Sequence, residues 1–160
     1  VADVAVGTFG KALGFFGAFV LLPPGFKEYL FNFSSPLIYT TTLPEAHAAT
    51  AIDILEIIER NDDRRKHLRF VSQYLKEGLL FHGFRVTGDA HILALEIGDE
   101  AKAALMARKL LQRDIFVLPA RYPTVPLHRS ILRISITALH EEEDIKAFID
   151  HVKGASGELG

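Results

Sequence analysis

The apolar residues in the second half of the chain switch between a helical spacing and a strand spacing, and this limits the possible fold more than any other feature. One group recurs at the spacing of a single helix face: Leu68, Val71, Leu75 and Leu79. A second group, Leu132, Ile134 and Ile136, recurs at every second residue, as on one face of a strand. A fold of packed helices and strands is therefore required to bury both.

The two spacings predict, in chain order, a helix ending near Gly83, strands at residues 84–87 and 91–97, a helix at 101–112, strands at 115–118 and 131–137, and a helix from 141 to about 152. Helices packed on a small mixed or antiparallel sheet would bury both kinds of face. The expected fold class is α/β.

The first part of the chain predicts two strands around a glycine-rich turn. Residues 1–6 are expected to form a short buried strand, and residues 17–22 a second strand that Pro23 and Pro24 end. The turn at residues 7–11 lies between them. Two strands joined in this way suggest the edge of a large sheet.

Helix signals in the middle of the chain indicate a domain boundary. Thr42 and Glu45 have the spacing of a capping box, and they predict a helix from about residue 43 to about residue 60. Asp62 or Asp63 is expected to cap the next helix. The linker at residues 61–63 is the expected boundary, which gives domains at residues 1–60 and 61–160.

Composition argues against several function classes. Of the 160 residues, 49% are hydrophobic and 24% are charged, which is typical of a globular chain. The net charge is -2 and basic residues form no long block, so neither a nucleic-acid groove nor a polybasic membrane patch is expected. The absence of cysteine excludes disulfides and thiolate metal sites and fits a cytoplasmic location.

The sequence predicts neither a membrane span nor a signal peptide. The uncharged run at residues 12–26 contains two prolines and is shorter than the roughly 20 apolar residues of a membrane helix. No basic segment precedes it, as a signal peptide would require. Because the chain begins with Val1, we expect a processed protein or part of a longer polypeptide.

Lys11, in the glycine-rich turn, is the first candidate for chemistry. The turn lacks the phosphate-binding pattern Gly-x-x-x-x-Gly-Lys-Ser/Thr, because Ala5 and Ala12 stand at two of its fixed positions, and it lacks the dinucleotide pattern Gly-x-Gly-x-x-Gly. A lysine in an apolar setting can act as a nucleophile or form a Schiff base. The alternative is a surface lysine on a flexible turn.

Three consecutive threonines, Thr40, Thr41 and Thr42, precede the expected helix. Hydroxyls and free backbone amides at a helix start would bind an anion such as a phosphate. The alternative is that Thr42 caps the helix and the other two end a strand.

Arg133 is the one charged residue in an otherwise apolar predicted strand, on the face opposite Leu132 and Ile134. If shielded from water it would need a carboxylate or phosphate partner, and its planar fork suits a carboxylate. The alternative is a solvent-facing arginine. The seven histidines show no metal-binding spacing, so no metal site is expected, and no Gly-x-Ser-x-Gly motif indicates a serine hydrolase.

Three segments of the chain carry a family resemblance. They are residues 3–14 with Gly17 and Ala18, residues 38–44 (Ile-Tyr-Thr-Thr-Thr-Leu-Pro), and residues 122–126 (Tyr-Pro-Thr-Val-Pro) with 132–135 (Leu-Arg-Ile-Ser). In this order they resemble the lysine loop, the threonine segment and the C-terminal signature of the α-oxoamine synthases, pyridoxal-phosphate enzymes of the aspartate-aminotransferase fold. The resemblance implies the end of the large cofactor-binding domain of a fold type I enzyme plus its small C-terminal α/β domain.

The resemblance also implies roles for five residues. Lys11 would form the Schiff base with pyridoxal 5'-phosphate and move the proton at the substrate Cα. Thr8 would bind the cofactor phosphate in the same subunit, and Thr40 or Thr41 would reach the cofactor phosphate of the neighbouring subunit in a homodimer. Arg133 would hold the carboxylate of the amino-acid substrate.

The implied activity is acyl transfer from an acyl-CoA or acyl-carrier thioester to an amino acid, with loss of CO2. In the family, the N-terminal half supplies the acid facing the pyridine nitrogen and the histidine stacked on the ring. This chain begins just before the lysine, so these 160 residues alone are expected to be inactive. A non-catalytic domain that keeps the fold without the chemistry is the alternative from a different class.

Overall fold

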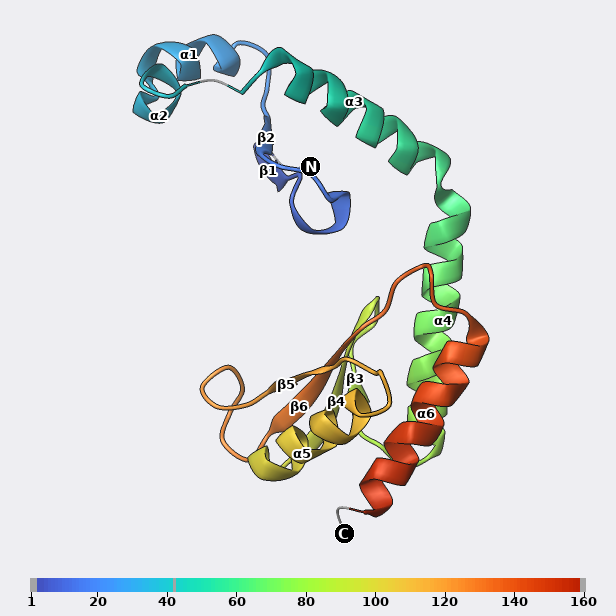
Figure 1. Ribbon diagram of the computed structural model, residues 1–160. Coiled ribbons are helices and arrows are strands. Elements are labelled where there is room, and N and C mark those ends of the chain that lie inside the picture. Colours follow the sequence, from blue (N-terminus) through green and yellow to red (C-terminus); the bar gives the residue numbers. More distant parts are fainter. Residues whose placement is uncertain (1–2, 42, 159–160) are drawn as a thin grey trace. The chain divides into compact units, whose positions relative to one another are not determined.

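The computed structural model describes residues 3–41 and 43–158, and the chain divides into two compact units. Unit 1 is Val1–Asn61 and unit 2 is Asp62–Gly160. Unit 1 begins with an antiparallel ribbon of strands β1 (Ala5–Thr8) and β2 (Ala18–Leu21), with a short 3-10 helix, Lys11–Leu13, between them. The helices α1 (Phe26–Phe33), α2 (Ser35–Ile38) and α3 (Glu45–Arg60) follow (Figure 1).

Strand β1 differs from the prediction. Gly7 and Thr8, expected in the turn, pair in the ribbon with Phe19 and Ala18. Val6 is exposed, so the expectation of a buried strand at residues 1–6 is wrong for the described part, and residues 1 and 2 lie outside it. A Cβ at Gly7 would lie 2.2 Å from the Phe19 ring, which explains a glycine inside this strand.

Helix α3 ends at Arg60, as predicted, and begins at Glu45, two residues later than expected. Pro44 stands at its N-cap without a side-chain cap, and the His47 backbone N–H donates to the Pro44 carbonyl at 2.9 Å. Thr42 lies outside the described residues, and with it the expected capping box.

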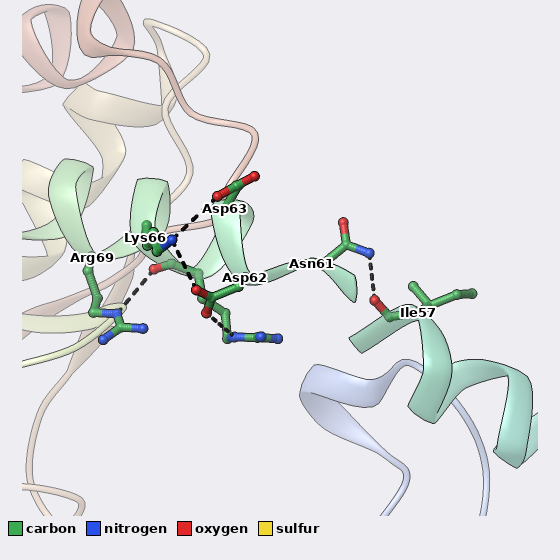
Figure 2. Close-up of polar contacts among 7 residues, drawn as sticks. Ile57, Asn61, Asp62, Asp63, Lys66 and Arg69 are labelled. Carbon is green, nitrogen blue, oxygen red and sulfur yellow. Dashed lines mark hydrogen bonds and ion pairs between the residues drawn. The ribbon is translucent and has the colours of Figure 1, made fainter. Parts of the chain in front are cut away.

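Separate contacts end α3 and begin α4 (Asp62–Phe81), as Figure 2 shows. The Asn61 side-chain amide donates to the Ile57 carbonyl at 2.6 Å and satisfies a free acceptor at the end of α3. Asp62 pairs with Lys66 and Arg65, both at 3.2 Å, in the first turn of α4. A carboxylate at this position also complements the helix dipole, and the helix begins at Asp62, one of the two residues expected to cap it.

Unit 2 is an α/β sandwich, as predicted. After α4 it contains β3 (Val86–Thr87), β4 (Ile92–Gly98), α5 (Glu100–Leu111), β5 (Leu118–Ala120), β6 (Ser130–Ser135) and α6 (Glu142–Gly157). The strands form an antiparallel sheet in the order β3-β4-β6-β5. Figure 1 shows the helices against this sheet, with α4 and α6 side by side.

The helices of unit 2 cover one face of the sheet. On that face Leu93, Leu95, Leu132 and Ile134 are buried. They belong to one core with side chains from the three helices: Val71, Leu75, Leu79, Met106, Leu110, Phe148, Ile149 and Val152. In the described part of unit 2, no helix covers the opposite face, on which Arg133 is exposed.

Strand β5 lies later than the predicted strand at residues 115–118. The Ile115 backbone N–H still donates to the Leu110 carbonyl at the end of α5, at 3.0 Å. Val117 is buried, but pairing with β6 begins only at Leu118, opposite Arg133. Ile115 therefore closes the helix and packs against the core, Val117 lies in the core, and Phe116 is exposed, and none of the three joins the sheet.

Side chains fix the beginnings of the last two helices. The Asp99 carboxylate accepts a hydrogen bond from the Lys102 backbone N–H at 2.8 Å at the start of α5. The Glu141 backbone N–H donates to the Asp144 carboxylate at 2.9 Å at the start of α6. Helix α6 continues to Gly157, beyond the predicted end near 152, because Ala155 extends its buried stripe.

Candidate active site

The chain between β1 and β2 forms a tight loop that presents Lys11, and we call residues 9–17 the lysine loop. The Phe9 N–H donates to the Gly17 carbonyl at 2.9 Å, and the Phe15 N–H donates to the Phe9 carbonyl at 2.8 Å. Gly14 and Gly17 have positive φ angles of 63° and 104°, which glycine adopts without a steric penalty. Their positions explain why the loop is rich in glycine.

Lys11 itself has a positive φ of 62°, in the left-handed region that residues with a Cβ rarely occupy. This conformation costs about 1–2 kcal/mol for a residue other than glycine. The Lys11 carbonyl accepts a hydrogen bond from the Gly14 N–H at 3.0 Å, which helps to hold the turn. Such backbone strain gathers at functional sites. The side chain is exposed, so the loop places the amine on a surface of unit 1.

An aromatic cluster packs within and against the lysine loop. Phe9 is buried, and its ring lies 5.1 Å from the Phe19 ring and 6.2 Å from the Phe15 ring, measured between centroids. His47 of α3 joins this cluster, with its ring stacked on Phe15 at 4.4 Å. Sequence reasoning considered His47 only as a possible metal ligand, and no motif in the sequence links it to the loop.

The threonines expected to bind phosphate lie on two segments of unit 1. Thr8 is the last residue of β1, exposed, three residues before Lys11. Thr40 and Thr41 are exposed in the connection between α2 and α3, where the Thr40 hydroxyl donates to the Thr41 carbonyl at 3.4 Å. They precede α3 by several residues, so they do not lie in its first turn. Within the described residues, none of the three threonines hydrogen-bonds Lys11.

Arg133 lies in unit 2, on the open face of the sheet. Residues on this face of β6 alternate with buried Leu132 and Ile134, as predicted, and Arg133 is exposed between Ala94 of β4 and Leu118 of β5. Among the described residues it forms no ion pair. The structure therefore has the solvent-facing arginine of the two alternatives, with its guanidinium available to a ligand.

Two carboxylates on or near this face, those of Glu96 and Glu100, already have partners. Glu96, two register positions along β4 from Ala94, contacts Arg129 at 3.3 Å and Arg85 at 3.7 Å. The His128 backbone N–H donates to the Glu100 carboxylate at 2.9 Å, which lowers the pKa of Glu100 and joins the loop before β6 to the start of α5. By contrast, Arg133 has no carboxylate partner among the described residues.

Two further findings concern metal binding and membrane crossing in the described ranges, 3–41 and 43–158. No three His, Asp or Glu side chains there gather closely enough to bind a metal ion. No helix in these ranges combines the length and the apolar character that crossing a bilayer requires.

Comparison with known proteins places the chain. The aminotransferase class I and II family matches residues 1–152. A putative 8-amino-7-oxononanoate synthase of Halalkalibacterium halodurans is 36% identical over 144 residues, which cover 89% of this chain and 36% of that protein.

Two solved structures are similar over almost the whole chain. A serine palmitoyltransferase of Sphingomonas wittichii has a TM-score of 0.87 at 30% identity and covers 99% of this chain. A structure of SPT with a PLP internal aldimine has the same TM-score and coverage at 32% identity. The chain spans 40% of each of those two chains.

These matches confirm the resemblance seen in the sequence. The chain belongs to the aminotransferase class I and II family and, within it, to the α-oxoamine synthases of pyridoxal-phosphate fold type I.

Proposed function

We propose that this chain forms the lysine-bearing part of a pyridoxal-phosphate-dependent acyltransferase. The enzyme joins the acyl carbon of an acyl-CoA, or of an acyl-carrier thioester, to the Cα of an amino acid. The thiol leaves from the acyl group and CO2 leaves from Cα, so the product is an α-oxoamine. Residues 1–60 would then end the large cofactor-binding domain, and residues 61–160 would form the small C-terminal domain.

The observation that carries the proposal is the conformation of Lys11. A lysine held at a φ of 62° in a closed loop, with its amine on the surface, is an arrangement that costs stability and positions a reactive group. A surface lysine on a flexible turn would need neither the strained φ nor the hydrogen bonds that close the loop.

The side chains of unit 1 fit part of a pyridoxal-phosphate site. The Lys11 amine would join the cofactor covalently, and the Thr8 hydroxyl, at the end of β1, would donate to the cofactor phosphate. When bound, the cofactor draws electrons away from the substrate Cα, which is the chemistry that this reaction needs. Once released from the cofactor, the Lys11 amine would take up and return the proton at Cα.

Arg133 would bind the carboxylate of the amino-acid substrate. Its exposed guanidinium has no counter-ion among the described residues, and a planar fork binds a carboxylate through two parallel hydrogen bonds. The flanking Ala94 and the apolar Leu118 leave it as the charged group at that register position. The result is an orientation of the amino acid that a single amine could not impose.

The subunit arrangement belongs to the same proposal. Thr40 and Thr41 would reach the cofactor phosphate of a neighbouring subunit in a homodimer with shared active sites. Their exposure in unit 1 leaves both hydroxyl groups accessible to such a ligand. We also propose a cytoplasmic location, which the absence of cysteine supports.

Within the family, the proposal that has the most support is 8-amino-7-oxononanoate synthase of biotin biosynthesis. The name of the Halalkalibacterium relative and the Pro-Thr-Val-Pro segment at residues 123–126 both favour it. The amino acid would then be alanine and the acyl donor a pimeloyl thioester.

The alternative within the family is another acyl and amino-acid pair, as in serine palmitoyltransferase, 2-amino-3-ketobutyrate CoA ligase or an α-hydroxyketone signal synthase. Leu127, His128 and Arg129 favour it, because they stand where members of the biotin pathway usually have small residues. The likeness to serine palmitoyltransferase structures supports it too. Assays with alanine, glycine and serine against a panel of acyl-CoA donors separate these enzymes.

The first test is borohydride reduction of the natural full-length protein, followed by peptide mass mapping. A pyridoxyl label on Lys11 is expected, and Lys11→Ala should abolish both label and turnover. Lys27→Ala is the matched control, because Lys27 is exposed in the same unit and lies over the Phe31 ring. Folded, cofactor-supplied protein without a label on Lys11 would favour a non-catalytic domain.

A further inference from the structure

His47 reaches across unit 1 from the first turn of α3 to the lysine loop. Its Nε2 lies 2.5 Å from the Phe16 carbonyl oxygen, a residue 31 positions earlier in the chain. A carbonyl oxygen only accepts, so Nε2 must carry the proton and donate.

The ring of His47 makes further contacts that fix its orientation. It stacks on Phe15 at 4.4 Å with an interplanar angle of 30°, and it meets Phe9 and Phe16 edge-on at 6.4 and 6.1 Å. The hydrogen bond and the stack together hold the segment that follows Lys11. The backbone hydrogen bonds of the loop involve Phe9, Phe15 and the Lys11–Gly14 turn, and none of them uses the Phe16 carbonyl.

Gly17 leaves the space that the ring occupies. A Cβ at Gly17 would lie 3.1 Å from Cε1 and 3.2 Å from Nε2 of His47, closer than side chains normally approach. The glycine at 17 thus has a reason beyond its positive φ. Helix α3 and the end of the loop fit each other at this one side chain.

We propose that His47 is a positioning residue, which holds the lysine loop through the Phe16 carbonyl and so fixes where the Lys11 amine lies. The part of this proposal that concerns Lys11 rests on the proposed function. The part that concerns the contact between His47 and the loop does not. Without the donor, the segment from Lys11 to Phe16 would keep only its backbone hydrogen bonds. The Lys11 amine would then sample more positions and reach the reacting atom less often.

Two variants separate the donor from the ring. His47→Phe keeps an aromatic ring of similar shape and removes the donor, whereas His47→Gln keeps a donor near the position of Nε2 and removes the ring. His82→Phe is the control, because the exposed His82 ring contacts Phe81 at the end of α4. Thermal melts of the full-length variants show first that each one folds.

The first readout is amide hydrogen exchange of the peptide covering residues 9–17, which needs no activity. In His47→Phe this peptide is expected to exchange about 2- to 10-fold faster, the range for one lost hydrogen bond. His47→Gln and His82→Phe should stay within about twofold of the natural protein. Unchanged exchange in His47→Phe, or equal acceleration in His47→Phe and His47→Gln, would overturn the proposal.

The second readout is the kinetics of the cofactor-loaded enzyme. His47→Phe should lower kcat by about 2- to 10-fold with the amino-acid KM unchanged, and His47→Gln should restore kcat. Faster exchange with an unchanged kcat would refute the positioning role. Absence of a borohydride label on Lys11 in the natural protein is a separate outcome, which removes the proposed function and leaves the exchange experiment to decide whether His47 holds the loop.

Discussion

The two units differ in how they bury their apolar side chains. In unit 2 the sheet and the faces of α4, α5 and α6 form one core, in which side chains such as Leu79 and Leu132 have no exposure at all. In the described part of unit 1, the buried apolar side chains are Phe9 and Ala51. Many of its large apolar residues are exposed, from Val6 in the ribbon to Tyr39 after α2.

Most of the buried core lies in unit 2, whereas most of the candidate site residues lie in unit 1. Unit 2 holds its fold with its own side chains, whereas unit 1 presents apolar surface of the kind that another protein surface normally covers. The strained lysine and the proposed phosphate-binding threonines belong to unit 1, which buries least. In unit 2, Arg133 is exposed on the face of the sheet opposite the core.

The largest expected effect tests the contrast in burial directly. Leu132→Ala should lower the free energy of unfolding by about 2–5 kcal/mol, because it leaves a cavity in the unit 2 core. Ile57→Ala, at a side chain that is 60% exposed, should change it by no more than about 0.5 kcal/mol. Urea unfolding of the 160-residue chain, followed by circular dichroism, gives both values.

The same pair in the full-length protein sharpens the comparison. If another part of the protein covers the α3 surface, the cost of Ile57→Ala should rise there while the cost of Leu132→Ala stays the same. An equal and large cost for both variants in the 160-residue chain would contradict the contrast.

Arg133→Ala tests whether the open face of unit 2 serves binding rather than stability. Amino-acid binding should weaken by about 2–5 kcal/mol if the carboxylate pair is shielded in the complex, and unfolding should be unaffected because the side chain is exposed. Arg133→Lys should recover only part of the loss, since lysine lacks the planar fork. Substrate titration and urea unfolding measure the two effects, and normal amino-acid affinity in Arg133→Ala would rule out this role.

Asp99→Ala should cost about 1 kcal/mol, because the Lys102 N–H at the start of α5 loses its acceptor. The loss belongs to unit 2, so the lysine loop should keep its hydrogen-exchange rates. Asp99→Asn, which keeps a capping oxygen, is the control and should cost little. A stability loss of the same size in both variants would show that the cap is not its cause.

The smallest expected effect is a decrease in the stability of unit 2 at low pH. Lys76 lowers the pKa of Asp89, and Lys109 lowers the pKa of Glu158. A lowered native pKa means that the stabilisation is present above the unfolded pKa, about 3.9 for Asp and 4.3 for Glu, and is lost as the pH falls through the native value. The urea concentration at the unfolding midpoint should therefore decrease slightly when the pH is lowered below about 4. Asp89→Asn should make this decrease with pH smaller. A midpoint that rises with acid would contradict it.

Much of unit 2 could be predicted from the sequence because its elements have one buried face. The stripe from Leu68 to Leu79 and the alternation from Leu132 to Ile136 both record contact with a core in the same chain. Helices α1 and α2 were not predicted. The apolar residues of α1, Phe26, Tyr29, Leu30 and Phe33, are spaced as on one helix face, but none of them is buried, and α2 is only four residues long. The predicted strand at 115–118 was misplaced because Val117 is buried, as a strand residue would be, while the Ile115 backbone N–H still bonds to the end of α5.

The site was less predictable than the fold. Sequence patterns led to Lys11 and Arg133 but could not show that Lys11 has a left-handed backbone, which depends on the closed loop. His47 gave no signal, because its partner is a backbone carbonyl 31 residues away and any residue type supplies a carbonyl. The roles of all five candidate residues, Lys11, Thr8, Thr40, Thr41 and Arg133, stay predictions.

Strand β6 has a consequence for how such proteins diverge. Every second residue, from Leu132 to Ile136, is constrained by the core, while Ile131, Arg133 and Ser135 face away from it. A mutation at 131 or 135 can therefore alter what lies beside the arginine without loosening the sheet. One strand thus carries two independent sets of positions, one that the core constrains and one around Arg133 that can change with little cost to the fold.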